Sequence, residues 1–267
     1  MHIVDSHAHL EFAQFDEDRD AMLERARAAG VETLLAIGSG TSPAERVDAA
    51  IPFAEQHDWI YATVGVHPHD ANVATDEHFA QLDELARHPR VIGWGEMGLD
   101  YYYDHSPRDV QKQAFRRQLA QARAAKLPVI IHCRDAWDDC LEILEQDWRP
   151  TGIGGIFHCF TGTIGEARRG LDMGFLISFA GNVSYPKNQQ IRDVAREIPL
   201  DQMLTETDSP FLAPQGRRGK RNEPAFVVEV AQTLANVRDL AADEVAAATA
   251  ANFRRLFKLG TGVSKPA

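Results

Sequence analysis

The sequence predicts an α/β protein that folds as a single (β/α)8 barrel, also called a TIM barrel. Short apolar and β-branched runs alternate with amphipathic helical stretches along the chain, which is typical of parallel strands joined by helical crossovers. Eight such units can be counted, and eight is the number that closes a parallel barrel. The length of 267 residues suits one such domain. An open doubly wound sheet is the alternative, but it normally has a glycine-rich loop after its first strand, whereas this chain has His9-Leu10-Glu11 there.

The predicted elements follow one another in strict alternation. The predicted strands are residues 3–10, 31–37, 60–66, 91–95, 129–132, 155–158, 175–179 and 203–206. The predicted helices are residues 16–29, 41–56, 76–87, 107–125, 137–145, 163–173, 188–197, 224–235 and an extra C-terminal helix at 243–257. We expect Thr41-Ser42-Pro43 to cap the second helix and Pro52 to kink or split it. Residues 1–258 are expected to form the barrel domain, followed by a tail at 259–267.

Composition restricts the class of protein. The net charge of −11 argues against a broad basic surface for nucleic acid but leaves open a small basic site. The three cysteines show no CxxC spacing and leave an odd thiol, so a disulfide framework is not expected and a reducing compartment fits. No apolar run approaches the roughly 18–20 residues of a membrane span, and the N-terminus lacks the pattern of a signal peptide. We therefore expect a cytoplasmic protein that does not bind membranes.

The first predicted strand contains the pair His7-Ala8-His9. Side chains alternate along a strand, so both imidazoles are expected to point to the same side. Such a pair can begin a metal site, although a His-x-His motif alone is more often structural or on the surface. The choice depends on whether other strands bring ligands to the same place.

Other predicted strands also end in metal-binding residue types. Their ends contain Gly65-Val66-His67-Pro68-His69, Gly95-Glu96-Met97-Gly98-Leu99-Asp100, Ile131-His132-Cys133-Arg134, Phe157-His158-Cys159-Phe160 and Thr205-Glu206-Thr207-Asp208-Ser209-Pro210. In a barrel these residues meet at one face, because the loops after parallel strands lie together. A single histidine there could be a hydrogen-bonded core residue, but imidazoles and carboxylates buried together are costly unless they are paired or bind cations. The sequence therefore predicts a metal site at this face.

The number of ligands suggests two divalent ions. The set comprises His7, His9, Glu96, His132, His158 and Asp208. A catalytic zinc ion usually takes three protein ligands, and a carboxylate placed between two ions can bridge them. Glu96 is the candidate bridge, because the fourth predicted strand has no lysine that could be carboxylated. Imidazole and carboxylate suit zinc or manganese, and magnesium is equally suited to phosphate chemistry.

These segments resemble the signature segments of the TatD family, in order and over residues 1 to about 258. The matching segments are His7-Ala8-His9, Gly65-Val66-His67-Pro68, Gly95-Glu96-Met97-Gly98-Leu99-Asp100, His132-Cys133-Arg134, His158-Cys159-Phe160-Thr161-Gly162, Glu206-Thr207-Asp208-Ser209-Pro210 and Arg218-Gly219-Lys220-Arg221-Asn222-Glu223-Pro224. The resemblance implies a TIM-barrel, metal-dependent hydrolase of the amidohydrolase superfamily, with members described as deoxyribonucleases. Two positions depart from the family pattern: Met97 stands where isoleucine is common, and residues 214–217 differ before the Arg-Gly-Lys element.

The resemblance also implies roles for the ligand set. His7 and His9 would hold one ion together with Asp208, and His132 and His158 would hold the other, with Glu96 between the two ions. Asp208 would take the proton from a metal-activated water and pass it to the leaving group. His67 and Asp100 lie in matching segments and are expected to shape the site or contact substrate. Glu206 is expected to lie behind the ligands or to pack.

Basic and aromatic residues near these strand ends are candidate substrate contacts. Arg134 follows His132, and the run Arg217-Arg218-Gly219-Lys220-Arg221 follows the eighth strand. An isolated basic run is usually a solvated loop, but rims of barrels often bind phosphate with the loops after strands seven and eight. We therefore predict substrate contacts from Arg134, Arg218 and Lys220. Tyr101-Tyr102-Tyr103 could stack on bases, although three adjacent residues cannot all face one pocket.

The leading expectation is a metal-dependent deoxyribonuclease that acts as a 3'-5' exonuclease on single-stranded DNA ends. The alternative keeps the metals and changes the bond: an amidohydrolase or esterase that cleaves C–N or aminoacyl-ester bonds, for example in D-aminoacyl-tRNA deacylation. The basic loop discriminates between them, because small neutral substrates do not need it. A barrel that keeps structural metal without activity is a third possibility, which the complete set of six ligands disfavours.

Overall fold

The computed structural model describes residues 1–40 and 46–260. Its eight strands form one sheet in the order β1-β2-β3-β4-β5-β6-β7-β8, and all successive pairs are parallel. The strands are β1 Ile3–Ala8, β2 Val31–Ala36, β3 Ile60–Val64, β4 Val91–Asp100, β5 Val129–Arg134, β6 Gly155–Phe157, β7 Phe175–Phe179 and β8 Met203–Thr205. The predicted (β/α)8 barrel is confirmed.

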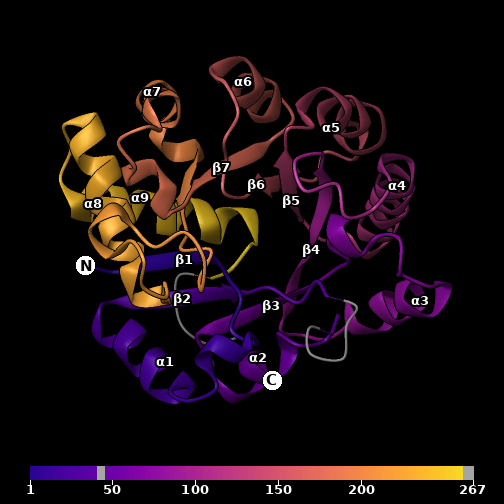
Figure 1. The fold of residues 1–267 in the computed structure, drawn as a ribbon, viewed down its shortest axis with the longest axis horizontal. Coiled ribbons are helices and arrows are strands. Elements are labelled where there is room, and N and C mark those ends of the chain that lie inside the picture. Colours follow the sequence, from indigo (N-terminus) through magenta and orange to yellow (C-terminus); the bar gives the residue numbers. More distant parts are fainter. Residues whose placement is uncertain (41–45, 261–267) are drawn as a thin grey trace.

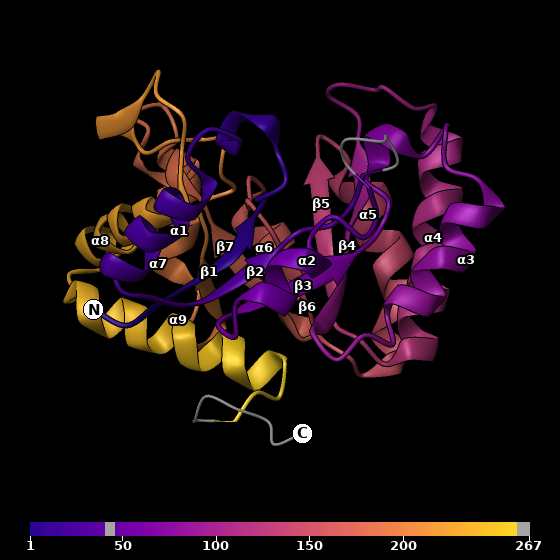
Figure 2. The same cartoon turned by 90° about the horizontal axis from the view of Figure 1, so that it is seen from below.

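The helices surround this sheet. They are α1 Arg19–Ala28, α2 Ile51–Gln56, α3 Asp76–Leu85, α4 Arg108–Ala125, α5 Trp137–Ile143, α6 Ile164–Asp172, α7 Gln189–Glu197, α8 Val227–Arg238 and α9 Ala242–Leu256. Figure 1 shows α1 to α8 as a ring around the strands. In Figure 2, α9 lies across one end of the barrel, and the loops that follow the strands rise at the other end.

Two predicted elements differ from the structure by five or more residues at one end. The second helix begins at Ile51, so Pro52 lies in its first turn, where a missing N–H is harmless, and does not kink it. The predicted cap at Thr41-Ser42-Pro43 lies outside the described residues. Residues 47–50, just before the helix, form turns. The fourth strand continues to Asp100, five residues beyond its predicted end, and so carries Glu96 within the sheet.

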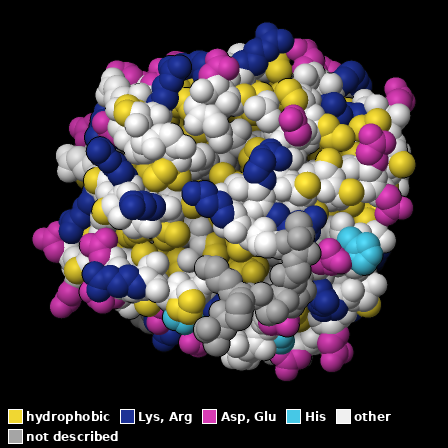
Figure 3. Space-filling view, turned by 180° about the vertical axis from the view of Figure 1, so that it is seen from behind, with side chains coloured by type: hydrophobic (Ala, Val, Ile, Leu, Met, Phe, Trp, Pro, Cys, Tyr) yellow, Lys and Arg dark blue, Asp and Glu magenta, His cyan; other side chains and the backbone are white. Residues whose placement is uncertain are grey.

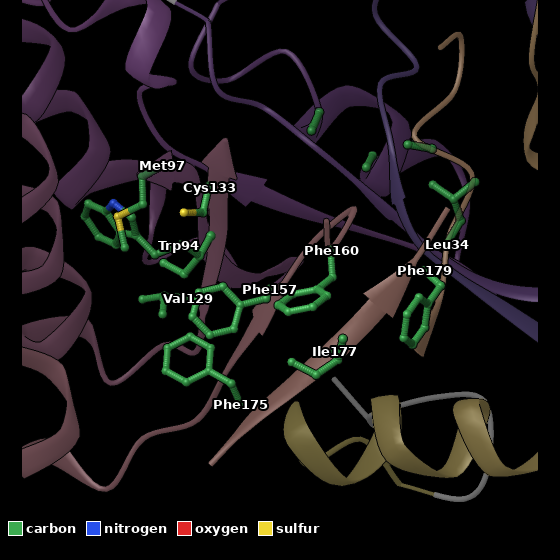
Figure 4. Close-up of a cluster of buried hydrophobic side chains, with 14 of the residues drawn as sticks. Leu34, Trp94, Met97, Val129, Cys133, Phe157, Phe160, Phe175, Ile177 and Phe179 are labelled. Atoms are coloured by element: carbon green, nitrogen blue, oxygen red, sulfur yellow. The ribbon is translucent and has the colours of Figure 1, made fainter. Parts of the chain in front are cut away.

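The core has two parts because strand side chains alternate between the barrel interior and the helices. Inside the barrel, Val4, Ile130 and Leu204 pack with Phe253 and other residues of one buried cluster, so α9 closes this end. Between strands and helices lies a larger cluster (Figure 4), in which the rings of Phe157 and Phe175 stack at 4.7 Å. The apolar interior fills one half of the barrel and leaves the other end for polar groups.

A backbone bridge and several side-chain hydrogen bonds close the barrel between its first and last strands. A single bridge joins Ala8 to Ser209. Beside it, Thr207 donates through its backbone N and its hydroxyl to the two carboxylate oxygens of Asp5, at 2.9 and 2.6 Å. The register of β1 shifts between Asp5 and Ala8, and Ser6 reaches Ser178 of β7 at 3.0 Å. Since Ser6 and the next residue, His7, both point inward, simple alternation fails at this point.

The end of the barrel opposite the site is covered with mixed side chains. Figure 3 shows this face, where Lys and Arg side chains are spread among neutral and apolar atoms and most acidic side chains lie toward the edges. Within the described residues, no helix combines the length and apolar character needed to span a membrane.

Candidate metal centre

Glu96 lies at the centre of the polar end of the barrel, and each of its carboxylate oxygens faces a different set of side chains. It is 2 % exposed. Oε2 faces the Nε2 atoms of His7 and His9, at 3.4 and 3.6 Å. Oε1 faces Nδ1 of His132 and Nε2 of His158, at 2.8 and 2.6 Å. The single carboxylate therefore joins two clusters of potential ligands.

The first cluster comes from both ends of the chain. The Nε2 atoms of His7 and His9 are 3.3 Å apart, as the prediction that they point the same way requires. Asp208 places Oδ1 3.7 Å from the first of these nitrogens and 3.6 Å from the second. Two backbone hydrogen bonds, from Asp208 N to His7 O and from His9 N to Ser209 O, hold the two segments together.

The second cluster comes from β5, the end of β6 and the loop after β3. Nδ1 of His132 lies 3.2 Å from Nε2 of His158. His67, for which the sequence suggested no ligand role, places Nε2 3.5 Å from the same Glu96 oxygen. The structure thus brings His67 within reach of this cluster.

Glycines let β4 carry Glu96 so close to its neighbours. A Cβ atom on Gly95 would lie 2.4 Å from the carbonyl oxygen of Ile130, and one on Gly98 would lie 2.0 Å from that of His132. Both glycines have positive φ, +146° and +143°, which L side chains rarely adopt. The peptide between Gly95 and Glu96 is cis.

Three of the four histidines of the two clusters are oriented by a further carboxylate on their other ring nitrogen. His9 Nδ1 lies 3.5 Å from Glu11, and His158 Nδ1 lies 3.3 Å from Glu206. His132 Nε2 lies 3.0 Å from Asp100. Such carboxylate–histidine pairs fix the ring and its tautomer in metal sites. The fourth histidine, His7, has a buried Nδ1 without a hydrogen-bond partner.

Asp100 is fully buried, and both of its oxygens are used by the protein. Oδ2 faces His132 Nε2 at 3.0 Å and His69 Nε2 at 2.9 Å. Oδ1 accepts from the backbone N of Tyr102 and of Tyr103. Of the two roles expected for Asp100, this geometry favours shaping the site over contacting substrate.

Burial and the dense packing of charges shift several pKa values. Burial, aided by the neighbouring His158, lowers the pKa of His7 to about 4. Burial opposes protonation of His9 as well, but Glu11, Glu96 and Asp208 outweigh it and raise the pKa of His9 to about 9. Burial raises the pKa of Asp208 to about 6. Although burial alone would raise it, the pKa of Glu96 is held well below its usual range by the histidines around it.

The residues present fit divalent cations. Groups of ligand atoms within 4.8 Å of one another are formed by His7, His9 and Asp208, and by Glu96, His132 and His158. Pairs of imidazole nitrogens face each other closely in both groups, an arrangement that a cation between them would satisfy. Nitrogen and carboxylate oxygen donors suit zinc or manganese.

The two clusters open into a cavity of about 840 Å³. Its lining includes Arg134 together with Phe12, Tyr103, Tyr185 and Phe211. This volume lies within the usual range of ligand pockets, roughly 300–1,000 Å³.

The basic run between β8 and α8 divides into two kinds of side chain. Arg217 pairs with Glu229 at 2.8 Å, and Arg221 pairs with Asp18 at 2.6 Å, so both contribute to structural ion pairs. Arg218 instead lies 4.5 Å from the centre of the Tyr185 ring, beside the cavity. Lys220 is exposed.

Sequence reasoning missed several residues of this site. Glu11 gives a local signal, since it follows His9 by two residues. Phe12, Tyr185 and Phe211 line the cavity but belong to no metal-binding pattern. Tyr101, by contrast, is used in packing: its hydroxyl donates to Asp139 at 2.5 Å, in line with the expectation that the three tyrosines differ.

The fold and this geometry can be compared with known proteins. The sequence profile described as "TatD related DNase" matches residues 4–258. The chain is 43 % identical to the metal-dependent hydrolase YabD of Bacillus subtilis, over 96 % of this chain and 99 % of the relative. It is 39 % identical to the 3'-5' ssDNA/RNA exonuclease TatD of Erwinia tasmaniensis, over 96 % and 100 %. The crystal structure of YJJV, a TatD homologue from Escherichia coli K12, superposes with a TM-score of 0.90 at 31 % identity, covering 97 % and 98 %.

Proposed function

The chain belongs to the TatD family of metal-dependent hydrolases, and from this premise we propose that it is a 3'-5' exonuclease that removes nucleotides from the ends of single-stranded DNA. The observation that supports this most is Glu96, whose two oxygens face two separate clusters of histidines. A relative 39 % identical to this chain carries the name 3'-5' ssDNA/RNA exonuclease. Residues 1–258 would act as one domain.

Two divalent cations would be held by the two clusters, with Glu96 between them. His7, His9 and Asp208 would hold one, and His132 and His158 the other. When bound, such cations supply an acidified water and neutralise charge on a phosphoryl oxygen. Zinc, manganese and magnesium are the candidates for both positions.

The protein's own groups would position the substrate and move the proton. Asp208 Oδ1 lies 3.7 and 3.6 Å from the Nε2 atoms of His7 and His9, and we assign its carboxylate the role of proton acceptor. Asp208 then returns that proton to the leaving oxygen. Glu11, Asp100 and Glu206 keep the histidine rings in place.

Basic side chains at the cavity would bind the phosphate groups of the substrate. Arg134 lines the cavity directly, and Arg218 lies on the ring of the lining residue Tyr185. Lys220 is exposed in the same loop. These groups provide a small basic site on a chain whose net charge is −11, and small neutral substrates would not need it. The three cysteines are free, which fits action in the cytoplasm.

The experiment asks which bonds the protein hydrolyses and whether substitutions in the candidate metal centre stop the hydrolysis. The protein, loaded in turn with Zn²⁺, Mn²⁺ and Mg²⁺, is incubated with single-stranded DNA and with a panel of carboxyl esters, aminoacyl esters and lactams. We expect release of mononucleotides from the 3' end of DNA, read from 5'-labelled oligonucleotides. Glu96→Ala and Asp208→Asn should abolish this release, whereas Asp193→Asn, a change at an exposed carboxylate of α7, should not.

Three results would contradict the proposal. Nucleotide release that survives both substitutions would show that this centre does not carry out the hydrolysis. Turnover of the ester or lactam panel without turnover of DNA would favour the amidohydrolase alternative. Elemental analysis that finds no divalent metal after reconstitution would exclude the metal-dependent mechanism.

A further inference from the structure

Exposed aromatic side chains are concentrated at the site. Among the described residues, the exposed large hydrophobic side chains are Met1, Val73, Tyr102, Tyr103 and Phe211. Tyr103 and Phe211, 50 % and 43 % exposed, line the cavity, and Tyr102 precedes Tyr103. Apolar surface gathered around one polar cavity is typical of a binding site rather than of random exposure.

The first aromatic cluster adjoins the first metal-binding cluster. Phe12 and Phe211 meet edge to face, with ring centres 5.3 Å apart. Both rings also contact the candidate ligand His9, at 5.3 and 6.2 Å. A planar group resting on Phe211 would therefore lie directly beside the position that His9 and Asp208 would hold.

The second aromatic cluster adjoins the other side of the centre. Tyr103 stacks on His105 with an angle of 9° between the ring planes. The guanidinium of Arg134 lies 4.7 Å from the centre of the Tyr103 ring and 3.9 Å from that of Tyr102. Tyr103 also contacts His69 at 5.4 Å, and this histidine shares Asp100 with the candidate ligand His132.

The barrel places these clusters across the cavity from each other. Phe12 follows β1, and Phe211 follows β8, whereas Tyr103 follows β4, and Arg134 ends β5. In a ring ordered β1 to β8, the contact between β8 and β1 lies opposite the pair β4 and β5. Glu96 and the histidines lie between. A strand that crosses the metal centre would thus have one base near each cluster.

We propose that Phe211 with Phe12, and Tyr103 with Arg134, form two stacking sites for the two nucleobases that flank the bond to be cleaved. This inference rests on the proposed nuclease function and names how that substrate is held. Stacking accepts every base, because every base has a π-face, and Arg guanidinium planes also stack on bases. Stacking needs unpaired bases, so both sites would favour single-stranded ends over duplex.

Binding of an oligonucleotide tests the inference independently of hydrolysis. A fluorescent single-stranded 12-mer is titrated with Mn²⁺-loaded protein carrying Asp208→Asn, and its Kd is measured by anisotropy. Two further 12-mers carry an abasic residue at the 3'-terminal or at the penultimate position. A second series uses the wild-type chain in EDTA, so that the result does not depend on the Asp208 substitution.

We expect each abasic residue to weaken binding by roughly 5- to 150-fold, the range for one stacked base. Phe211→Ala should weaken binding of the intact 12-mer by a similar factor and remove the penalty at one abasic position. Tyr103→Ala should remove the penalty at the other position. Phe211→Trp and Tyr103→Phe should restore both affinity and penalty, and Val73→Ala, an exposed apolar residue outside the cavity lining, should change nothing.

Additive effects, in which the abasic penalties persist in both alanine variants, would overturn the inference. So would equal binding of the intact and abasic 12-mers, or no binding at all. If the predicted pattern appears but the metal-loaded wild type releases no nucleotides, the stacking sites stand and the proposed exonuclease activity falls.

Discussion

Replacing Asp100 by asparagine should weaken metal binding at the second cluster without changing any of the ligands proposed there. Oδ2 of Asp100 faces Nε2 of His132 at 3.0 Å, and Oδ1 accepts from two backbone N–H groups. Asparagine has the same shape but offers one acceptor and one donor. If its amide nitrogen faces His132, that ring can no longer donate from Nε2, so its proton moves to Nδ1, the atom that faces Glu96. If the amide nitrogen turns the other way, it meets the N–H groups of Tyr102 and Tyr103.

The magnitude follows from what such a carboxylate does elsewhere. Loss of the partner that orients a ligating histidine costs about 10- to 100-fold in metal affinity, which corresponds to about 1.4–2.7 kcal/mol. We therefore expect Asp100→Asn to raise the Kd of one of two Mn²⁺ ions by that factor. Activity should fall at low Mn²⁺ and recover in part at high Mn²⁺.

A chelator-competition titration with Mn²⁺, run with the hydrolysis assay over a range of metal concentrations, measures this. Asp104→Asn is the matched control: it makes the same chemical change four residues later, at an exposed carboxylate paired with Arg108. Its positive φ of 55° also suits asparagine. The control should alter stability by less than about 0.5 kcal/mol. Metal affinity in Asp100→Asn equal to that of the wild type, with the fold intact, would refute the reasoning.

Three further predictions follow from the site. The neighbouring carboxylates raise the pKa of His9 to about 9 in the metal-free protein, and a ligating imidazole must lose its proton. Metal affinity at the first cluster should therefore rise about tenfold per pH unit up to pH 9 and stay constant above it. Calorimetry in buffers of different ionisation enthalpy should detect the released proton, and an affinity that does not change with pH would contradict this prediction. Gly98→Ala should lower the free energy of unfolding, measured with denaturant, by about 3 kcal/mol or more, because its Cβ would lie 2.0 Å from a β5 carbonyl oxygen. Gly152→Ala, at a residue with positive φ but nothing within 4 Å, should lower it by about 1 kcal/mol. Equal losses in the two variants would contradict the close approach at Gly98. Arg218→Glu combined with Lys220→Glu should slow DNA turnover and reduce its dependence on salt concentration. Unchanged kinetics would indicate that this loop is an ordinary solvated loop without substrate contacts.

Much of the architecture could be predicted because it depends on local pattern. Apolar runs and helical stretches alternate along the chain, which predicts parallel strands, and the count of eight units together with the absence of a glycine-rich loop after the first strand favours a closed barrel. Residues such as His132 and His158 stand at the ends of their runs, where a barrel gathers its polar groups. Their convergence on Glu96 follows from topology and needs no knowledge of side-chain contacts.

The features that could not be predicted depend on contacts between segments that are distant in sequence. The sequence does not show which residues of the basic run form ion pairs: Arg217 and Arg221 pair with Glu229 on α8 and with Asp18 just before α1. Asp18 is 203 residues away from Arg221 in sequence, so no local pattern shows that the two residues pair.

Irregular backbone also could not be predicted from the sequence. The shift in β1 turns both Ser6 and His7 inward, which a strict period of two does not predict. The extension of β4 through Glu96 likewise depends on glycines at points of close approach between strands.

The seam between β1 and β8 also determines when the centre can be completed during synthesis. The chain is made from its N-terminus, so Glu96, His132 and His158 are all present well before β8 exists. His7 and His9 are made first of all, yet their carboxylate partner Asp208 follows the last strand. A nascent chain could therefore assemble the second cluster while the first still lacks Asp208. The two clusters of side chains, although joined by one carboxylate, become available in the reverse of the order in which their first histidines are made.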